Sequence, residues 1–344
     1  MAKILVAMSG GVDSSVCLKL LIDEGHELCG ATFVTDDSEE SLKGAADARD
    51  VAEKFAIPHH VINIAEEFKS AVKDYFVRTY EAGATPNPCV ICNREIKFGL
   101  LLRYAEKLGY SEIATGHYAK LDKTGDRCRL IRAADAAKDQ TYMLALVPEE
   151  ALKKSHFPLG DYTKAEIRAM AAEMGISTAD KKDSQDICFI PDGDYVKFLT
   201  EYRGHAPMRG KYVAEDGRVL GEHMGQECYT IGQRKGLGIA LGRHVFVLDR
   251  NAENNTVTLG DADGLMKDTL TVDGVNLIGR SNIFDGEELD VKIRYAHRAA
   301  RAKVFHREDG KLEVKFAEPQ RAPSPGQFAV FYDGDEAVGG GVIV

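Results

Sequence analysis

Two cysteines, Cys89 and Cys92, follow two prolines in the stretch TPNPCVICN of residues 85–93. A proline removes a backbone N–H and stiffens the chain, and the residue before it is disfavoured in the helical conformation. The stretch therefore predicts that both thiols lie on a stiff loop with little regular structure. Such a pair suits three kinds of chemistry: a disulfide, half of a metal site, or a catalytic thiol with its neighbour.

A second stretch whose residues could bind a ligand, MSGGVDSSV, covers residues 8–16. Its two glycines let a ligand approach the backbone, its serines offer hydroxyls, and a following helix would offer unpaired N–H groups to an anion. Asp13 could hold Mg²⁺, which in turn would hold phosphates. A tight turn with an N-cap serine is the alternative, but S-G-G-x-D-S straight after a strand favours phosphate. The stretch is not G-x-x-x-x-G-K-[ST], and no lysine in it reaches forward to a γ-phosphate.

Strands and helices alternate along the first half of the chain, which predicts an α/β domain with a parallel sheet and helices on both faces. We expect Asn93 to be the N-cap of a helix, and Thr163 with Glu166 to form a capping box. The expected strands cover 3–8, 27–34, 59–64 and 112–115, and the expected helices cover 12–24, 41–57, 95–109 and 163–175.

The residue pattern changes near residue 205, where glycines and short β-rich runs replace long amphipathic helices. This pattern predicts two small, mainly β domains, the C-terminal one barrel-like. The expected limits are 1–200 for the α/β domain, 205–265 for a central β domain and 266–344 for the C-terminal barrel-like domain. The boundary between the two β domains falls within 260–268.

The composition, 44% apolar and 28% charged over 344 residues, predicts a soluble, globular protein of two or three domains. No apolar run approaches the about 20 residues of a membrane span, and seven scattered cysteines do not resemble a secreted disulfide framework. We therefore expect a cytoplasmic protein with no membrane partner. The net charge of −10 argues against nucleic acid, yet residues 291–307 hold six Lys or Arg and no acid, which suits RNA.

The S-G-G-x-D-S stretch resembles the PP-loop of the ATP pyrophosphatases, which adenylate a substrate and release pyrophosphate. Six further motifs, together and in order, are similar to the bacterial tRNA-specific 2-thiouridylase family, MnmA, along the whole chain. These motifs are TPNPCVICNREIKFG (85–99), ATGHYA (114–119), KDQTYML (138–144), KKDSQDICFIP (181–191), IGQRKGLGI (231–239) and PGQFAVFY (325–332). The resemblance implies an adenine-nucleotide alpha hydrolase-like (PP-loop) N-terminal domain.

The resemblance also implies roles for single residues. Cys92 matches the catalytic thiol of the family, and Cys188 matches the cysteine that receives a persulfide sulfur from a donor protein. The residues around Cys92 agree, because a helix N-terminus, Arg94 and Lys97 would each lower the pKa of its thiol. The residues implied to line the ATP site are Ala7, Met8, Ser9, Gly10, Gly11, Val12, Asp13, Ser14, Phe33 and Gly116.

Contacts with tRNA are likewise implied by the resemblance. Asn87, Pro88 and Cys89 match the positions where the target base is held. The remaining matched tRNA contacts are His117, Lys138, Asp139, Gln140, Arg294, Tyr295 and Gln327. Taken one at a time, a solvated turn at 138–140 or an exposed strand face at 291–307 would explain these residues equally well. The motif GQRKGLG (232–238) suits either an RNA contact or a glycine-rich hairpin.

Cys89 departs from many members of the family, which carry aspartate at this position. With a cysteine there, Cys89, Cys92 and Cys188 could form a three-thiolate set that suits an iron–sulfur cluster or a metal. A C-x-x-C pair can also tune a reactive thiol. The sequence leaves both readings open, and the expected cofactors are ATP and Mg²⁺ with or without a cluster.

The function that these features predict is ATP-dependent 2-thiolation of the wobble uridine of tRNA. It would proceed by adenylation of the C2 oxygen and sulfur transfer from a cysteine persulfide. A PP-loop ligase or amidotransferase that acts on a small metabolite is the competing enzyme, and it would need neither tRNA nor Cys92 and Cys188. A non-catalytic RNA-binding protein with a structural zinc is a third hypothesis, but it leaves SGGVDSS unexplained.

Overall fold

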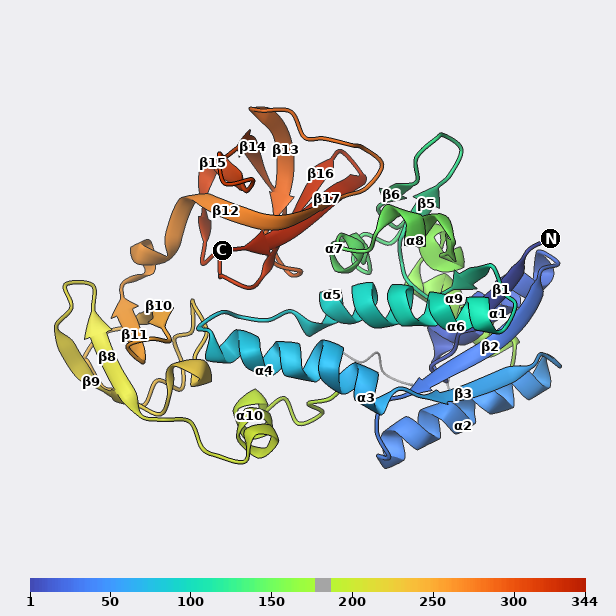
Figure 1. The fold of residues 1–344 in the computed structure, drawn as a ribbon, viewed down its shortest axis with the longest axis horizontal. Helices are drawn as coiled ribbons and strands as arrows, with labels where there is room; N and C mark the ends of the chain where they lie inside the picture. Colours follow the sequence, from blue (N-terminus) through green and yellow to red (C-terminus); the bar gives the residue numbers. More distant parts are fainter. Residues whose placement is uncertain (177–186) are drawn as a thin grey trace.

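The computed structural model describes residues 1–176 and 187–344. Within these ranges the N-terminal part contains a parallel sheet of five strands in the order β3-β2-β1-β4-β7, at the right of Figure 1. Its strands are β1 (Lys3–Ala7), β2 (Glu27–Val34), β3 (His59–Asn63), β4 (Glu112–Ala114) and β7 (Ser155–His156). The predicted α/β fold with a parallel sheet is thereby confirmed.

Alternate residues of the central strand β1 face opposite sides of the sheet. Leu5 packs with one apolar cluster, which also contains buried residues of the helices that begin at Pro88. Ile4 and Val6 pack with another cluster, against α1 (Val12–Asp23), α2 (Glu39–Lys54) and α9 (Lys164–Glu173). Helices therefore cover both faces, as predicted, and the capping box of Thr163 and Glu166 is present at α9.

Two long helical segments lie side by side and extend from the sheet toward the central domain (Figure 1). The first runs through α3 (Ala65–Phe68), the π-helix η1 (Lys69–Lys73) and α4 (Asp74–Glu81), and the second through α5 (Pro88–Cys92), the π-helix η2 (Asn93–Leu100) and α6 (Leu101–Lys107). The remaining helices of this part are α7 (Thr141–Leu144), α8 (Glu149–Lys153), the 3₁₀ turn η3 (Pro158–Asp161) and α10 (Tyr195–Arg203).

The second segment corrects two predictions. Cys89 and Cys92 lie in a helix, not on an irregular loop, because Pro88 occupies its first turn, where a missing N–H costs nothing. Asn93 is not an N-cap: its backbone is helical, and its side chain donates a hydrogen bond to the Met143 carbonyl at 2.9 Å. The N-cap is Asn87, whose Oδ1 accepts from the Val90 N–H at 3.4 Å.

The central domain is a small sheet in the order β10-β11-β8-β9, at the left of Figure 1. Tyr212, Val247 and Val257 are fully buried in its core. Its elements are β8 (Gly210–Ala214), β9 (Val219–His223), the 3₁₀ turn η4 (Gln226–Cys228), β10 (Phe246–Asn251), β11 (Thr256–Gly260) and the 3₁₀ turn η5 (Ala262–Leu265).

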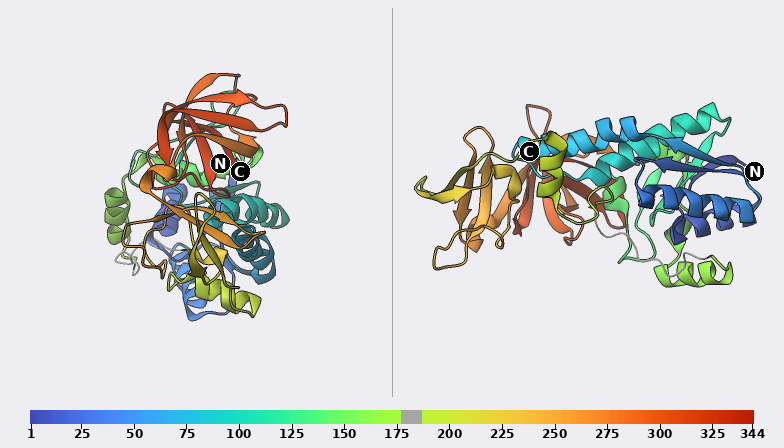
Figure 2. Two further views of the ribbon diagram at one scale, coloured as in Figure 1. Left: turned by 90° about the vertical axis from the view of Figure 1, so that its left-hand side faces the viewer. Right: turned by 90° about the horizontal axis from the view of Figure 1, so that it is seen from below.

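The C-terminal domain is a barrel, and pairing between β12 and β17 closes it. Figure 2 shows the barrel in red and orange, with the N-terminal sheet and the central domain at opposite ends of the long axis. Its strands are β12 (Met266–Leu277), β13 (Glu287–Lys292), β14 (Ala300–His306), β15 (Leu312–Arg321), β16 (Phe328–Asp333) and β17 (Glu336–Ile343). The prediction of two small β domains, the last one barrel-like, is confirmed.

A hairpin of the N-terminal part joins the barrel. It is formed by β5 (Lys120–Asp122) and β6 (Arg129–Ile131), and β6 pairs with the start of β17 through Ile131 opposite Glu336. Its strands of three residues are too short to leave a periodic pattern, so the sequence does not predict them. None of the helices formed by residues 1–176 and 187–344 has the length and apolar character that a membrane crossing needs.

Candidate active site

The loop between β1 and α1 is shaped to receive an anion. Gly11 is the N-cap of α1 and offers no side chain to the first N–H groups of the helix, so these groups remain available. Ser14 Oγ accepts from the Ser9 N–H at 3.2 Å and donates to the Gly11 carbonyl at 3.1 Å. Gly10 has φ +71°, and a Cβ there would lie 2.4 Å from the Gly44 carbonyl oxygen. Only glycine therefore fits at this turn.

The other residues predicted for ATP lie in the loop itself, in the strands β1 and β2, or after β4. Met8 is buried behind the loop, Phe33 lies half-buried at the end of β2, and Gly116 follows β4. A Cβ at Gly116 would lie 3.0 Å from the Asp13 carbonyl carbon, so Gly116 touches the loop directly. Ala7 ends β1 and Val12 begins α1.

Asp13 forms an ion pair that the sequence does not reveal. Lys164 Nζ, at the start of α9, lies 2.8 Å from Asp13 Oδ1 and 2.9 Å from Oδ2. Tyr118 donates its hydroxyl to Oδ1 at 2.8 Å. A lysine thus reaches the nucleotide loop from far along the chain. In the sequence Lys164 is visible only as the residue after the N-cap Thr163, which does not predict this contact. The role of Asp13 as a Mg²⁺ ligand stays a prediction, because both of its oxygens already bond to Lys164.

The three motif thiols lie on two segments of the chain, α5 and the turn that contains Cys188. Cys89 lies exposed in the first turn, Cys92 lies half-buried at the end of α5, and Cys188 lies in an exposed turn. The ring of Phe189 packs edge-on to Phe68 and Phe76, with centroids 5.9 and 5.4 Å away, and so anchors this turn. Residues 181–186 of the KKDSQDICFIP motif lie outside the described residues. All three thiols are free.

Each of these thiols is electrostatically coupled to the others. Burial raises the pKa of Cys92 to about 12; the charge of Lys97 opposes this shift, while Cys188 and Cys89 add to it. Desolvation likewise raises the pKa of Cys89 and of Cys188, and Lys97 again opposes the shift. The expectation of a lowered pKa at Cys92 is therefore wrong: Cys92 lies at the end of α5, away from the N-terminal N–H groups, and desolvation of its thiol outweighs the charge of Lys97.

Lys97 is the cation that these thiols share. Cys92 is the last residue of α5, and Lys97 follows it in the π-helix η2, whose backbone bonds run between residues five apart. Arg94, the other cation expected to act on Cys92, pairs with Glu95 at 2.7 Å. Lys97 forms no ion pair with any acidic residue in the described ranges.

His117 is buried rather than displayed to a ligand. It is 7% exposed, its Nδ1 lies 2.7 Å from Thr115 Oγ1, and its ring lies 5.5 Å from that of Phe98. Burial, and secondarily the charge of Lys97, hold its pKa well below the usual value, so the imidazole is neutral. Its tRNA contact stays a prediction.

The KDQ segment is part of the protein core rather than a solvated turn. Asp139 is buried, and its carboxylate accepts bonds from the Ala133 N–H at 3.2 Å and the Thr141 hydroxyl at 2.7 Å. Gln140 Oε1 accepts from the Tyr118 N–H at 2.9 Å. Lys138 is half-buried at the segment's start. The segment therefore connects α7 to the strand region beside the nucleotide loop, and its contact with tRNA stays a prediction.

Of the three residues of the C-terminal domain predicted to contact tRNA, Arg294 and Gln327 form hydrogen bonds to other parts of the chain, and Tyr295 has an exposed aromatic ring. Arg294 donates to the carbonyls of Ile231 and Ala322 at 3.3 and 3.0 Å, and Gln327 Nε2 donates to those of Thr85 and Pro86 at 3.1 and 3.0 Å. Tyr295 is 38% exposed. Arg294 and Gln327 thus hold the barrel to the central domain and to the chain just before Asn87 and Pro88.

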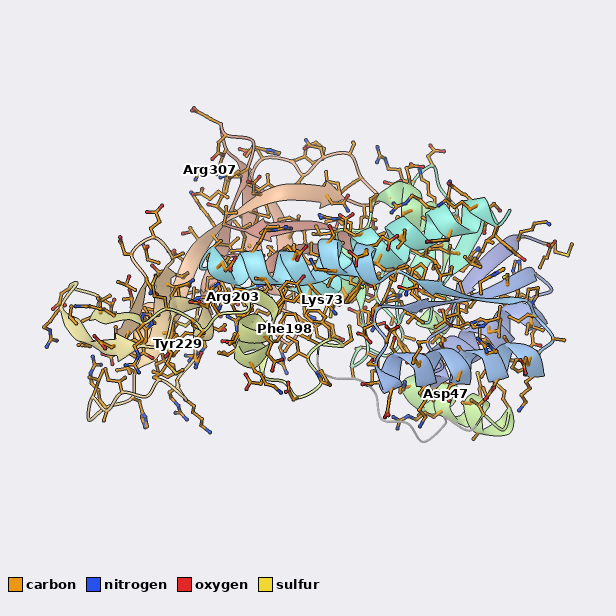
Figure 3. The ribbon with its side chains drawn as sticks, turned by 60° about the horizontal axis from the view of Figure 1, so that its bottom comes forward. Asp47, Lys73, Phe198, Arg203, Tyr229 and Arg307 are labelled. Carbon is orange, nitrogen blue, oxygen red and sulfur yellow. The ribbon has the colours of Figure 1, made fainter. Side chains whose placement is uncertain are left out.

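Several basic side chains of residues 291–307 already form ion pairs within the protein, so only part of this run is free to contact phosphates. Arg301 and Lys303 on β14 pair with Glu288 on β13, at 3.2 and 3.6 Å, and Arg307 pairs with Asp309 at 3.4 Å. Figure 3 places Arg307 at the outer tip of the barrel. Arg298, in the loop before β14, is exposed and has no ion pair with any residue of the described ranges.

Family models match the chain in three consecutive segments. Residues 2–192 match the tRNA methyl transferase HUP domain, 196–261 match the tRNA methyl transferase PRC-barrel domain, and 267–343 match the aminomethyltransferase beta-barrel domain. These matches cover all of the predicted catalytic and binding residues. The domain limits 1–200, 205–265 and 266–344 stay a prediction from the sequence.

Several relatives are similar along the whole chain. The tRNA-specific 2-thiouridylase MnmA of Treponema denticola is 44% identical over 99% of this chain and 97% of its own length. That of Carboxydothermus hydrogenoformans is 45% identical over 99% and 97%. Among solved structures, the U34-tRNA thiolase NcsA of Methanococcus maripaludis, with its [4Fe-4S] cluster, superposes with a TM-score of 0.37, is 18% identical, and covers 58% of this chain and 67% of its own.

Proposed function

The chain belongs to the family of the tRNA-specific 2-thiouridylase MnmA, and we propose that Cys92 and Cys188 carry sulfur in its ATP-dependent thiolation of tRNA uridine. The family membership sets aside the ligase of small metabolites and the non-catalytic RNA-binding protein. One observation supports the relay above all: Phe189, the neighbour of Cys188, packs against the same apolar cluster as Cys92, and Cys188 adds to the rise in the pKa of Cys92. Uridine thiolation needs ATP and a sulfur donor, and these two thiols supply the sulfur path.

The first step activates the base. The wobble uridine leaves its stack, since its C2 carbonyl is otherwise hard to reach. Its O2 attacks the α-phosphorus of ATP, the bond to pyrophosphate breaks, and an adenylated uridine forms. The N–H groups at the start of α1, with Gly10 and Ser14, receive the phosphates. The nucleotide would chiefly hold Mg²⁺, since both oxygens of Asp13 already bond to Lys164, and the ion would supply neutralisation of phosphate charge.

The second step delivers sulfur. A donor protein leaves a persulfide on Cys188. The Cys92 thiolate attacks the Cys188 sulfur, the S–S bond of the persulfide breaks, and hydrosulfide departs while a disulfide joins Cys92 to Cys188. Hydrosulfide then attacks C2, the C2–O bond breaks, and AMP leaves with that oxygen. A thiol reductant reduces the disulfide for the next turn. Covalent carriage divides one difficult substitution into easier ones.

The raised pKa of Cys92 adds a requirement to this scheme. A thiol with a pKa of about 12 is protonated near neutrality, so it must lose a proton when the substrates assemble. Lys97 is the charge that stabilises the resulting thiolate, because its effect lowers the pKa of Cys92, Cys89 and Cys188 alike. Deprotonation of Cys92 is therefore a step that must come before the attack on Cys188.

An iron–sulfur cluster is the alternative use of the same thiols. Among residues 1–176 and 187–344, no group of three or more His, Cys, Asp or Glu side chains is arranged to hold a metal ion. The thiols as they stand do not fit a cluster, and we derive no step through one. We further propose that the reaction takes place in the cytoplasm, with tRNA and a persulfide donor protein as partners.

The test is mass spectrometry of nucleosides after unmodified tRNA is incubated with ATP and a protein persulfide donor. We expect 2-thiouridine from the native chain and from Cys228→Ala, whose thiol matches no motif, and none from Cys92→Ala or Cys188→Ala. Cys89→Asp should retain activity in a thiol relay. An inactive Cys89→Asp variant, together with stoichiometric iron in anaerobically purified protein, would replace the relay by a cluster.

A further inference from the structure

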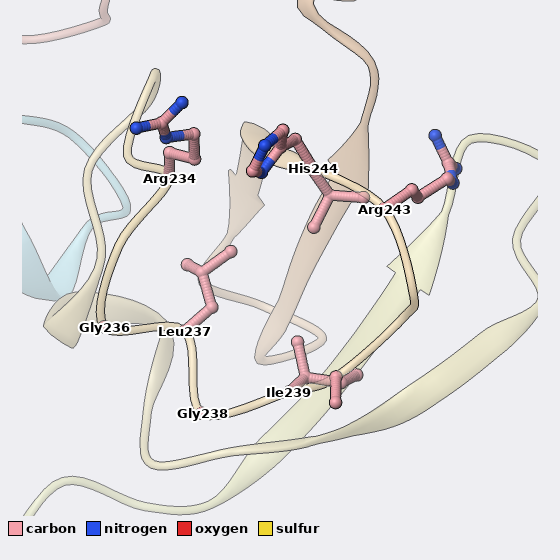
Figure 4. Close-up of a pocket in the computed structure, with 9 residues that line it drawn as sticks. Arg234, Gly236, Leu237, Gly238, Ile239, Arg243 and His244 are labelled. Carbon is pink, nitrogen blue, oxygen red and sulfur yellow. The ribbon is translucent and has the colours of Figure 1, made fainter.

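The central domain carries a cavity of about 490 Å³ that the thiolation chemistry does not use. The glycine-rich loop 232–245, between η4 and β10, forms it (Figure 4). We call it the central loop pocket. Its volume falls in the range of sites that hold small ligands, roughly 300–1,000 Å³. The GQRKGLG motif supplies one side of it.

Hydrogen bonds fix the shape of this loop. Gln233 accepts from the Thr230 N–H and donates to the Lys235 carbonyl, each at 3.0 Å. Tyr212, fully buried in the domain core, donates its hydroxyl to the Leu237 carbonyl at 2.6 Å. A loop held at its turn and at its apex presents its side chains in a defined arrangement. The pocket is thus formed before any ligand arrives.

Cations lie at the mouth of the central loop pocket. Arg234 lines the pocket, and its chain neighbour Lys235 lies just outside the lining. Both are exposed, and neither forms an ion pair with an acidic residue in the part of the chain that the structure describes. Figure 4 shows Arg234 and His244 at the rim, with Arg243 farther along it. Arg243 is held by Asp261. In a chain with a net charge of −10, a cationic rim attracts an anion locally.

The floor of the pocket is apolar. Leu237 and Val245 are buried, Ile239 is half-buried, and all three line the cavity. An apolar floor below a cationic rim suits a ligand with a flat, weakly polar body flanked by phosphates. An unpaired nucleotide of RNA has this character, and proteins commonly bind such nucleotides in pockets or on apolar faces. An RNA stem offers no such nucleotide, because its bases are stacked and paired.

From this arrangement we propose that the central loop pocket binds one unpaired nucleotide of the tRNA, distinct from the uridine that is thiolated. The base lies against Leu237 and Ile239, and Arg234 and Lys235 contact the phosphates beside it. The proposal rests on the proposed function, since that function makes tRNA the substrate. It gives the central domain a part in holding the tRNA while Cys92 and Cys188 act elsewhere.

The test measures tRNA binding by the full chain with single changes at the pocket. Ala240 is exposed and lines the cavity, so Ala240→Asp adds a negative charge where a nucleotide would lie, and Ala240→Asn is its neutral match of nearly equal size. We expect Ala240→Asp and the double change Arg234→Glu/Lys235→Glu to raise the Kd at least tenfold. The double change should also flatten the slope of log Kd against log salt concentration by about one for each phosphate that the variant no longer binds.

Two controls separate this proposal from the function itself. Ala240→Asn and Arg218→Glu, the latter in the turn between β8 and β9, should bind tRNA as the native chain does. Nucleoside analysis at saturating tRNA should still show 2-thiouridine for every variant. Native Kd and salt slope in Ala240→Asp and the double change would overturn the pocket proposal while the function stands. The pocket variants could instead bind tRNA as the native chain does and lose thiolation only when a persulfide donor protein supplies the sulfur. That result would overturn the pocket proposal and would indicate that the pocket is an interface with the donor protein. Absence of 2-thiouridine from the native chain would overturn the function instead.

Discussion

At the scale of single residues, the site combines signals that the sequence displays with others that only the folded chain reveals. The phosphate loop and the two motif cysteines stand out as spacings, and the structure brings Gly116 against the loop that precedes α1. Lys164 and Tyr118 carry no such spacing, since they meet Asp13 only through packing. The pKa of Cys92 also follows from burial, which a list of neighbouring charges does not contain.

The pKa of Cys92 predicts how this thiol reacts with iodoacetamide. Only the thiolate is alkylated, so labelling should be slow at pH 8 and accelerate about tenfold per pH unit up to pH 10. Peptide mapping by mass spectrometry separates Cys92 from the exposed Cys89 and Cys188. Lys97→Met should slow labelling at every pH, because it removes the charge that lowers the pKa, and Lys97→Arg should restore the rate.

Arg94→Met is the matched control for Lys97, because Arg94 is paired with Glu95. It should leave the pH profile of Cys92 nearly unchanged. A labelling rate that reaches its plateau below pH 8 in the native chain would show that Cys92 is already a thiolate and would refute the need for a proton loss on substrate assembly.

The pair of Asp13 with Lys164 predicts an effect on ATP affinity. Lys164→Met leaves the Asp13 carboxylate uncompensated beside the phosphates, and we expect the Kd for ATP, measured by calorimetry, to rise about tenfold, or 1.4 kcal/mol. Adding Asp13→Asn should recover part of this loss, because it removes the repelling charge. Two losses that simply add in the double variant would show that the pair does not act as a unit.

At the scale of elements, the strands β1 to β4 and the helices α1, α2, α6 and α9 could be predicted, because their sequences carry a clear period and a glycine or capping signal. The helical segment of residues 65–81 and the short elements α7, α8 and β7 were not predicted. The helix beginning at Pro88 could not be predicted, since a proline before a C-x-x-C pair suits a loop and a first helical turn equally well. The π-helical turn at Asn93–Leu100 leaves no pattern in the sequence either. These two features decide where Cys92 points, so the local geometry of the site was the part that needed the structure.

The cap of this helix can be tested directly. Asn87→Ala removes the acceptor for the Val90 N–H and should lower the free energy of unfolding by about 1 kcal/mol. Asn87→Ser keeps a capping oxygen and should retain most of that stability. The midpoint of urea unfolding measures both. An equal loss in the two variants would mean that Asn87 stabilises the chain through other contacts than the cap.

At the scale of the whole molecule, the barrel, the central domain and the helices around the cysteines are held together by specific hydrogen bonds. Gln327 bonds to the chain before Asn87, and Arg294 bonds across to Ile231. The sequence predicts the order of domains but not these contacts, because they join residues from distant segments. Two residues predicted to contact tRNA therefore also set the position of the domains.

The basic run of the barrel predicts different effects for two neighbouring arginines. Arg298 is exposed and has no ion pair with any described residue, so Arg298→Glu should weaken tRNA binding and flatten its salt dependence. Arg301 already pairs with Glu288, and Arg301→Glu should have the smaller effect. Filter binding at several salt concentrations measures both. Equal effects of the two changes would mean that charge near the barrel acts in general rather than through Arg298.

The pairing of β6 with β17 has a consequence for how the chain is made. Residues 129–131 leave the ribosome early, but their partners at Glu336 and Ala337 lie in β17, which is made much later. The β5–β6 hairpin must therefore keep one edge unpaired until β17 has been synthesised. During that interval the open edge is exposed to association with the strands of other chains.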